Sequence, residues 1–382
     1  MLRFLTAGES HGKAIVAILE GIPSGLEITV EEIQTDLDKR RMGAGRGGRG
    51  LIESDKVEIL SGIRNGITIG SPISLLIPNL DYSNWKNQMA EKKGIVMPIS
   101  NPRPGHADMA GSLKYGFNDV RNVLERASAR ETVARVAVGA IVRKLLKELN
   151  IRVLSHTIAI GKITLDKFEY SLSNVEKYVK KDPITRCIDH NTAIKMQKEI
   201  FTATKNKDTL GGVIEVIAHG VPPGLGSYVH YDRKLDARIA FSLMSIPSVK
   251  AVEIGDGIRN SSKVGSHVQD EIFYEKSKYI RKTNHAGGLE GGVTNGEDII
   301  CHIFLKPIST IGVPLKTVNI ITKKQVNALT ERSDICVVPR AGIVCESMLI
   351  FTIAESFLEK FGQDNLNDIK NNFANYINSR DI

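Results

Sequence analysis

Cysteine is scarce in this sequence: the 382 residues include only four, Cys187, Cys301, Cys336 and Cys345. None of them forms a C-x-x-C pair, which argues against a metal knuckle. Thiols scattered this thinly through a long chain are typical of a reducing compartment. We therefore expect free thiols and no metal site.

Long apolar segments are also missing. The first twelve residues, M-L-R-F-L-T-A-G-E-S-H-G, contain no stretch that resembles a signal peptide. No run approaches the ~18 apolar residues that would span a membrane. No G-x-x-x-x-G-K-[ST] motif is found, so a Walker ATPase is not expected. The sequence predicts a cytoplasmic protein without a membrane partner.

The charge balance is mildly basic, with a formal net charge of +8 and charged residues making up 25% of the chain. Such an excess fits nucleic acid, a membrane surface or a small polyanion, and does not choose among them. The excess is concentrated locally, because residues 39–49 hold five cations and no acid.

Segments of the first half of the chain recur in the second half. Residues 12–26 read G-K-A-I-V-A-I-L-E-G-I-P-S-G-L, and residues 211–225 read G-G-V-I-E-V-I-A-H-G-V-P-P-G-L. Each segment is typical of a strand that runs into a Gly-Pro turn. Two shorter echoes follow in the same order, 66–70 with 292–296 and 125–127 with 331–333.

Three echoes in one order favour an internal duplication over chance recurrence of turns. We therefore expect one domain over residues 1–382, built from halves of approximately 1–200 and 201–382. Strands mixed with long helices predict an α+β class with layered sheets and helices. The apolar spacing predicts helices over about 129–149, 232–245 and 346–361, and Ser128 with Glu131 predicts a capping box at the first of them.

Two arginine-rich segments are candidate anion sites. Arg126 and Arg130 flank the start of the 129–149 helix, where unpaired amide groups and the helix dipole favour an anion. The alternative is that both arginines pair with Glu125 and Glu131 on a solvated face. Residues 40–50, R-R-M-G-A-G-R-G-G-R-G, are interpreted as a loop that closes over a ligand, or alternatively as an RNA-binding Arg-Gly segment.

Two of the nine histidines have unusual neighbours. His11 lies in G-E-S-H-G at the edge of a predicted strand, and His106 lies in the rigid segment N-P-R-P-G-H-A-D. Histidine is the natural proton carrier near neutral pH, although a lone histidine is more often structural. The glycine-dense segment 284–292 would let a flat ring or a phosphate approach the backbone.

Together these segments resemble the chorismate synthase family. The resemblance is carried, in family order and over nearly the whole chain, by A-G-E-S-H-G (7–12), R-R-M-G-A-G-R-G-G-R (40–49), R-P-G-H-A-D (103–108), E-R-A-S-A-R-E-T (125–132), D-R-K-L-D-A-R (232–238), G-G-L-E-G-G-V-T-N-G (287–296), L-K-P-I-S-T (305–310) and R-S-D-I-C-V-V-P-R-A (332–341). Two departures are small: Ile335 stands where the family often has proline, and Ile258 where it often has phenylalanine.

The resemblance implies a lyase that converts 5-enolpyruvylshikimate 3-phosphate to chorismate by anti-1,4 elimination of phosphate, without net redox change. It implies reduced FMN as cofactor, supplied by an external reductase that uses NAD(P)H, because the chain has no insertion that could hold one. It further implies a β/α/α/β layered sandwich with internal duplication and a homotetramer. The competing hypotheses are an RNA-binding protein and a flavin-binding homologue without turnover.

The resemblance also assigns residues. His11 resembles the acid near the departing phosphate, His106 the group that protonates the reduced flavin, and Asp334 the residue that helps to remove the ring proton. The implied substrate contacts are Arg40, Arg46, Arg49 and Arg130. The implied flavin contacts are Arg126, Ala127, Ser128, Pro247, Ser248, Gly291, Lys306, Pro307, Ile308, Ser309, Thr310 and Arg332.

Overall fold

Two antiparallel sheets form the framework of the computed structural model, which describes residues 1–47, 52–92, 94, 96–166, 171–331 and 333–380. The first sheet has the order β1-β2-β6-β3. Its strands are β1 (Arg3–Ala7), β2 (Ala14–Glu20), β6 (Ile73–Pro78) and β3 (Glu58–Ile59). Along β2, Ile15 and Leu19 are buried whereas Ile18 is exposed, so alternate side chains of this strand face the core.

The second sheet has the order β10-β15-β9-β7-β8. Its strands are β10 (Val249–Ile254), β15 (Ile299–Leu305), β9 (Gly212–His219), β7 (Arg152–Ile160) and β8 (Ile163–Thr164). On β15, Ile299, Cys301 and Ile303 are buried. Helices α7 (Leu172–Lys181) and α8 (His190–Lys205) contact β7.

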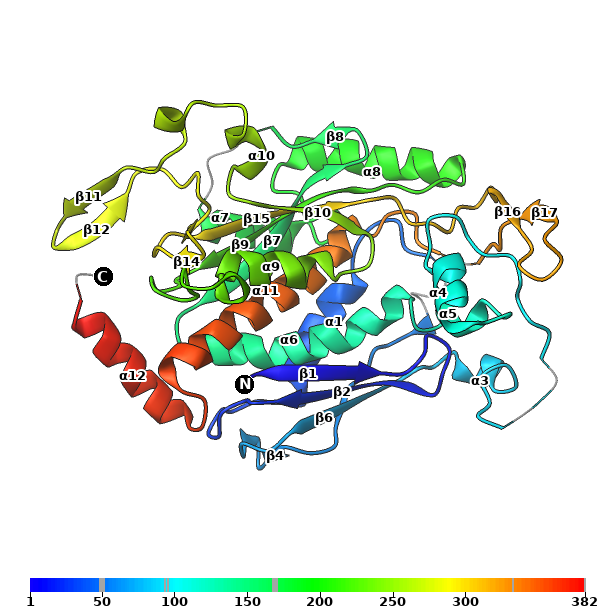
Figure 1. Cartoon of the computed structure of the whole chain (residues 1–382), viewed down its shortest axis with the longest axis horizontal. Helices are drawn as coiled ribbons and strands as arrows, with labels where there is room; N and C mark the ends of the chain where they lie inside the picture. Colours follow the sequence, from blue (N-terminus) through cyan, green and yellow to red (C-terminus); the bar gives the residue numbers. More distant parts are fainter. Residues whose placement is uncertain (48–51, 93, 95, 167–170, 332, 381–382) are drawn as a thin grey trace.

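Long helices lie between the two sheets (Figure 1). Helix α6 (Thr132–Lys147) contacts β1, β2 and β6, and α11 (Val338–Phe361) contacts β7 and β9. The two helices pack against each other and against α1 (Val30–Arg41), while α9 (Leu235–Met244) packs on α11. The continuous apolar core runs through these helices and the inner faces of both sheets. The protein is therefore of the α+β class.

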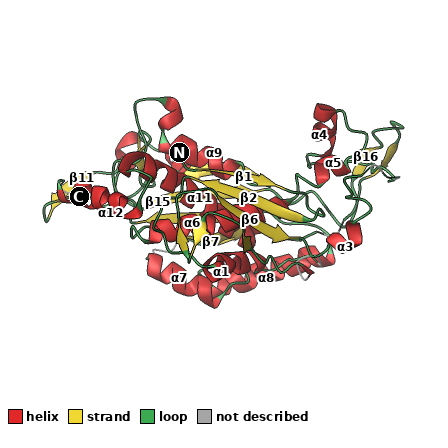
Figure 2. Cartoon of the chain, turned by 90° about the horizontal axis from the view of Figure 1, so that it is seen from below, coloured by secondary structure: helices red, strands yellow, loops and turns green. Residues whose placement is uncertain are grey.

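Short elements gather at the two ends of the molecule. Figures 1 and 2 show α4 (Asp108–Tyr115), α5 (Arg121–Leu124) and the hairpin β16–β17 (Lys316–Val318, Gln325–Asn327) at one end. The hairpin β11–β12 (Ile272–Glu275, Lys278–Arg281) and α12 (Leu366–Asn378) lie at the other end. The remaining short elements are α3 (Tyr82–Trp85), α10 (Gly257–Asn260), β4–β5 (Ile63–Arg64, Ile67–Thr68), β13–β14 (Leu289–Glu290, Val293–Thr294) and the 3₁₀ turns Ala129–Glu131, Tyr231–Arg233 and Gly265–His267.

The three predicted helices exist, but their starts differ from the prediction. Residues 129–131 form a 3₁₀ turn, and the α-helix begins at Thr132. Ser128 is the N-cap of this turn, as predicted, and its hydroxyl accepts from the Arg130 amide. The Glu131 half of the predicted capping box is wrong, because the Glu131 carboxylate binds Thr6 and Arg135 instead of reaching back to Ser128. The α9 helix likewise follows a separate 3₁₀ turn.

Helix α11 begins at Val338, eight residues before the predicted start. Pro339 is tolerated there because the first turn of a helix needs no amide donor. This helix has no unbroken run of ~18 apolar residues, but by length and composition alone it could cross a membrane, since its mean hydropathy reaches 1.6 over an 18-residue window. Its side chains are almost all buried among the other core elements, as expected of a core helix.

The first two pairs of echoed segments, 12–26 with 211–225 and 66–70 with 292–296, share the same turn geometry. Gly25 and Gly224 have φ of 89° and 90°, respectively. In the first copy the Thr68 hydroxyl donates to the Pro23 carbonyl and accepts from the Leu26 amide. In the second copy Thr294 makes the same two bonds to Pro222 and Leu225.

Candidate active site

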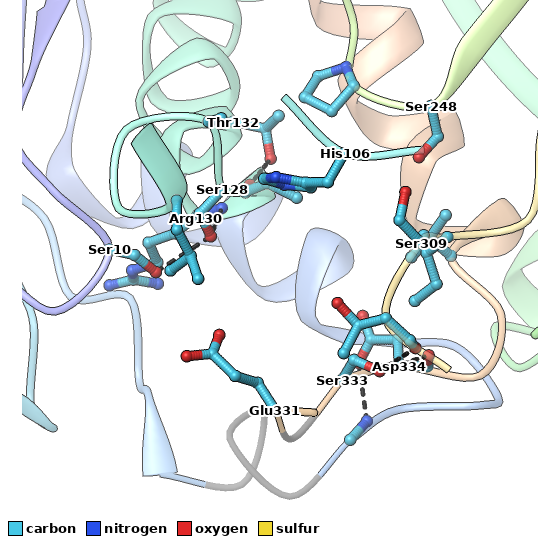
Figure 3. Close-up of a pocket in the computed structure, with 18 of the residues that line it drawn as sticks. Ser10, His106, Ser128, Arg130, Thr132, Ser248, Ser309, Glu331, Ser333 and Asp334 are labelled. Atoms are coloured by element: carbon cyan, nitrogen blue, oxygen red, sulfur yellow. Dashed lines mark hydrogen bonds between the residues drawn. The ribbon is translucent and has the colours of Figure 1, made fainter. Parts of the chain in front are cut away.

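A cavity of about 860 Å³ opens between segments that are far apart in the sequence. This volume is within the ~300–1,000 Å³ range of small-molecule sites. Its wall includes the start of the α6 region, the end of α1 and the loops before α4 and α11. Figure 3 shows Ser10, Ser128 and Arg130 on one side and Ser309, Ser333 and Asp334 on the other. Two backbone hydrogen bonds connect the segment before α4 to the segment before α11: the Ile320 amide donates to the Ser100 carbonyl, and the Leu329 amide donates to the Asn101 carbonyl.

His11 is fixed in the wall by a buried carboxylate. Glu125 Oε2 accepts from the His11 backbone amide at 2.7 Å, and Glu125 Oε1 lies 2.8 Å from His11 Nδ1. The imidazole also stacks on Trp85, with ring centroids 4.2 Å apart. Burial raises the pKa of Glu125, but bonds from His11 and Arg121 outweigh it, so the net pKa is lowered and the carboxylate is ionised.

His106 has a similar carboxylate partner. Asp108 Oδ1 lies 2.5 Å from His106 Nδ1, and Asp108 Oδ2 accepts from Arg103 Nε at 2.9 Å. Burial opposes ionisation, yet the bonds from His106 and Arg103 keep the pKa of Asp108 well below its usual range. Gly105, which directly precedes His106, has φ of 77°, a left-handed conformation that favours glycine and lets the chain turn just before His106.

The arginine segment folds into the cavity wall beside Asp334. Arg40 and Arg41 are the last two residues of helix α1, so the segment predicted as a loop leaves the helix only after Arg41. The Gly47 amide donates to Asp334 Oδ1 at 2.7 Å, and Arg340 Nη1 donates to Asp334 Oδ2 at 2.5 Å. Figure 3 shows the bond to Asp334 as a dashed line. Gly47 and Asp334, which are 287 positions apart in the sequence, are thereby in direct contact.

The wall holds more positive than negative charge. Among its described residues are seven arginines and lysines (Arg40, Arg41, Arg46, Arg103, Arg130, Lys306 and Arg340) and five acids (Glu53, Asp55, Asp81, Glu331 and Asp334). Burial, with added repulsion from Arg130 and Arg340, lowers the pKa of Arg40 to about 10 despite Asp55. Burial and repulsion from Arg340 and Arg41 also lower the pKa of Arg46. An anionic ligand would relieve this repulsion.

The amino-acid sequence is similar to a well-populated enzyme family. The family model described as chorismate synthase matches residues 2–358. The chorismate synthase of Alkaliphilus metalliredigens is 50% identical over 380 residues, which cover 98% of this chain and 99% of that protein. The chorismate synthase of Carboxydothermus hydrogenoformans is 50% identical over 384 residues, which cover 99% of both.

A solved structure shows the same likeness. A crystal structure titled as a chorismate synthase superposes with a TM-score of 0.80 and 38% identity, covering 99% of this chain and 98% of that one. The chain belongs to the chorismate synthase family. The chorismate synthases are lyases of the shikimate pathway.

Most of the residues that the family resemblance assigned lie in this cavity. The wall contains the three predicted catalytic residues, His11, His106 and Asp334. It also contains Arg40, Arg46, Arg130, Ala127, Ser128, Pro247, Ser248, Lys306, Ile308, Ser309 and Thr310. Ser248 has φ of 73°, a strained conformation for a non-glycine residue that is often found at functional sites.

Several assigned residues lie elsewhere. Arg126 is exposed and donates to the carbonyls of Thr6 and Gly8, so it is not in the described cavity wall. Gly291 lies in the β13–β14 turn beside Tyr228, also apart from that wall. Pro307 lines a neighbouring cavity of about 360 Å³ that shares Lys306, Ile308 and Ser309 with the main one. Arg49 and Arg332 lie outside the described residues.

Arg130 is held by acids that the sequence did not reveal as its partners. It pairs closely with Asp55, and its Nη2 lies 3.4 Å from Glu53. This corrects the alternative pairing with Glu125 and Glu131, which have other partners: Glu125 binds His11 and Arg121, and Glu131 binds Arg135. Asp55 also pairs with Arg40, whose Nη1 lies 3.2 Å from Asp55 Oδ2. Burial raises the pKa of Asp55, but its contacts with Arg40 and Arg130 outweigh burial and lower it.

Sequence reasoning gave no role to several residues of the site, namely Ser10, Trp85, Arg103, Asp108, Arg121, Glu331 and Arg340. Ser10, Arg103, Asp108 and Arg340 stand in motifs that carried the family resemblance, so their motif membership was an available signal. Trp85, as the single tryptophan, was the other signal. The described residues contain no cluster of three or more His, Cys, Asp or Glu that could hold a metal.

Proposed function

We propose that this chain catalyses the anti-1,4 elimination of phosphate from 5-enolpyruvylshikimate 3-phosphate, giving chorismate. The carbon–oxygen bond to phosphate breaks, a ring carbon loses a proton, and the two electrons of that C–H bond enter the new diene. Membership of the family, together with a cavity that combines His11, His106 and Asp334, carries the proposal.

The charge of the cavity fits this substrate. The substrate carries a phosphate and two carboxylates, and arginine forks bind such groups with paired hydrogen bonds. Arg40 and Arg46, whose lowered pKa values reflect burial and mutual repulsion, are the arginines that gain most from a bound anion. Arg130, which pairs with Asp55 and Glu53, and Arg49 remain part of the proposed substrate contacts.

The cavity also fits a flavin phosphate. Lys306, Ser309 and Thr310 offer an ammonium and two hydroxyls along one wall, and Ser128 and Ser248 lie along the others. These residues, with Ala127, Pro247, Pro307 and Ile308, would hold reduced FMN. When bound, reduced FMN supplies electron density that helps the phosphate to depart. Arg126, Gly291 and Arg332 remain part of the proposed flavin contacts, although the described cavity wall does not include them.

Three side chains of the cavity would donate, hold or accept protons in the reaction. His11, whose Nδ1 contacts Glu125, can donate a proton from its other ring nitrogen to the departing phosphate. His106, whose Nδ1 contacts Asp108, can hold a proton beside the flavin. The Asp334 carboxylate is fixed by Gly47 and Arg340 and assists removal of the ring proton.

We also infer the wider context of this activity. The absence of a reductase insertion fits an external reductase that uses NAD(P)H, in the cytoplasm. The family resemblance supports a homotetramer. The matching turns at Thr68 and Thr294, together with the helices between two sheets, support a β/α/α/β sandwich made of two duplicated halves in one domain.

The RNA-binding hypothesis has lost its main support. Arg40 and Arg46 line an internal cavity beside Asp55 and Asp334 instead of forming a solvated polar tail. We expect nucleic-acid binding to be absent or non-specific at physiological salt.

One assay tests the proposed function. The chain is incubated anaerobically with reduced FMN and the enolpyruvyl substrate, and chorismate is followed by its absorbance. Oxidised FMN and omission of flavin are the controls. Formation of chorismate and phosphate in equal amounts, only with reduced flavin, supports the proposal. Flavin binding without product would favour the homologue without turnover.

A further inference from the structure

The two cavity histidines share an arrangement that the proposed reaction does not by itself explain. Each contacts a carboxylate through Nδ1, and each carboxylate contacts an arginine: His11 with Glu125 and Arg121, and His106 with Asp108 and Arg103. A carboxylate at one ring nitrogen fixes the tautomer and leaves the other nitrogen for proton exchange. The His11 arrangement is the more informative, because Glu125 also accepts a hydrogen bond from the backbone amide of His11.

Glu125 holds His11 at two points. One carboxylate oxygen accepts from the backbone amide at 2.7 Å, and the other lies 2.8 Å from Nδ1. The side chain of Glu125 is 2% exposed, and that of His11 is 10% exposed. Since both the backbone and the ring are restrained by one carboxylate, any displacement of Glu125 moves the imidazole.

The remaining contacts complete the restraint. Arg121 donates to Glu125 Oε1 at 2.8 Å, and its guanidinium also lies over the Trp85 ring, 4.8 Å from its centroid. Trp85 also packs against the His11 ring, and its indole N–H donates to Asp81 at 3.2 Å. The charged groups that these contacts link to the imidazole include Glu125 and Arg121 from one segment and Asp81, through Trp85, from another.

We propose that Glu125 is a positioning residue for His11: it fixes Nδ1 as the bound ring nitrogen, stabilises the protonated ring, and leaves Nε2 to face the ligand. The catalytic part of this inference rests on the proposed function. The electrostatic part does not, because it concerns only the titration of His11 in the free protein. Glu125 acts through His11 and needs no contact with substrate.

Three variants of the full-length protein test the proposal. Glu125→Gln removes the charge at nearly constant size, and Glu125→Asp keeps the charge but withdraws it by one methylene. Glu215→Gln is the matched control, because Glu215 is also a buried glutamate that binds histidines, namely His156 at 2.9 Å and His302 at 2.8 Å, apart from the described cavity wall. Circular dichroism checks that each variant is folded.

The first readout is independent of catalysis. Diethyl pyrocarbonate reacts with neutral imidazole, so the pH dependence of His11 modification, measured by peptide mass spectrometry, reports its titration. Removing a neighbouring carboxylate disfavours the charged ring. We expect the midpoint for His11 to lie lower in Glu125→Gln than in the parent protein, to fall less in Glu125→Asp, and to stay unchanged in Glu215→Gln.

The second readout is catalytic. Because His11 would act as an acid, Glu125→Gln should lower kcat by roughly 10-fold or more, within the ~10²–10⁴-fold contribution of a general acid. The alkaline limb of its pH–rate profile should move to lower pH, while KM stays within about threefold. Glu125→Asp should recover part of kcat, and Glu215→Gln should retain it.

The outcomes separate the two proposals. An unchanged His11 midpoint in folded Glu125→Gln overturns the positioning role, whatever the activity. If Glu125→Gln does not fold, an unchanged midpoint in folded Glu125→Asp does the same. A shifted midpoint with no chorismate formed even by the parent protein supports the positioning of His11 and refutes the proposed function. A lowered kcat with an unchanged midpoint also overturns the inference.

Discussion

Arg46 offers a test in which binding and stability should respond in opposite directions. In the free protein its charge is disfavoured, because burial and the nearby Arg340 and Arg41 lower its pKa more than Asp334 and Asp55 raise it. Replacing Arg46 with alanine removes this repulsion. We therefore expect the free Arg46→Ala protein to melt at the same temperature as the parent or slightly higher.

The same substitution should weaken substrate binding. One charge-assisted hydrogen bond is worth about 1.5–3 kcal/mol, which corresponds to roughly 10-fold or more in Kd. At a substrate concentration of ~100 times the parent Kd, the ligand stabilises the parent by about 2.7 kcal/mol. With a Kd ~10 times higher, the stabilisation falls to about 1.4 kcal/mol. At about 2.1 cal/mol/K per residue, the loss of ligand-induced melting shift is about 1.6 °C.

Calorimetric melting with and without substrate, and titration of reduced FMN as the second ligand, measure these effects. Arg46→Lys is the matched control, because it keeps the charge and loses only the planar fork. Flavin affinity should change much less than substrate affinity. A free variant that melts several degrees lower, with undiminished substrate binding, would refute the reasoning. Equal loss of both ligands would move Arg46 to the flavin side.

Three further predictions follow from particular contacts. His11→Ala and His106→Ala should each lower kcat by roughly 10²–10⁴ with native circular dichroism, and unchanged rates would contradict the assigned roles. Burial raises the pKa of Glu215, but bonds to His156 and His302 outweigh it and lower this pKa to about 2. The Glu215 carboxylate therefore stabilises the protein at pH values above its unfolded pKa of ~4.5, and this stabilisation is lost as the pH falls toward ~2. Burial lowers the pKa of His302, but its contact with Glu215 outweighs burial and raises it. The protonated His302 therefore adds stability below pH ~6.5, and this stability is lost as the pH rises through the folded pKa of His302. Denaturant titration of Glu215→Gln should therefore show its largest loss, up to about 3 kcal/mol, between pH ~4.5 and ~6.5, and a pH-independent loss would contradict this. Thr68→Val and Thr294→Val should each cost about 1–3 kcal/mol, because each leaves a buried carbonyl and amide without their partner, and a large loss in only one would argue against equivalent turns.

The sequence predicted the fold where local patterns decide structure. Apolar segments that run into Gly-Pro turns predicted the strands around Ile15 and Ile214, which are buried in the two sheets. The start of α11 could not be predicted, since nothing local distinguishes residues 338–345 as helical. That segment is helical because its side chains, such as Val338 and Cys345, are buried against other elements. Tertiary packing, not propensity, decided that boundary.

The site was predictable only as far as the family motifs carried it. These motifs named His11 and Asp334, but not what holds them. Glu125 lies 114 positions from His11, and Gly47 lies 287 positions from Asp334. No spacing rule connects residues so distant in the sequence. Arg126 shows the converse: it directly follows Glu125, yet its side chain reaches the first strand instead of the cavity.

The proposed duplication gives these placements a common origin. Under that proposal Glu125 and Glu331 occupy equivalent positions of the two halves, and both contact Arg121, at 2.8 and 3.4 Å. The first half places Glu125 behind His11, and the second places Glu331 in the cavity wall itself. Figure 3 shows Glu331 facing the open space near Ser10 and Arg130. A single asymmetric ligand between two similar halves cannot meet the same group twice, so equivalent glutamates would diverge into one that orients a proton carrier and one that faces the ligand.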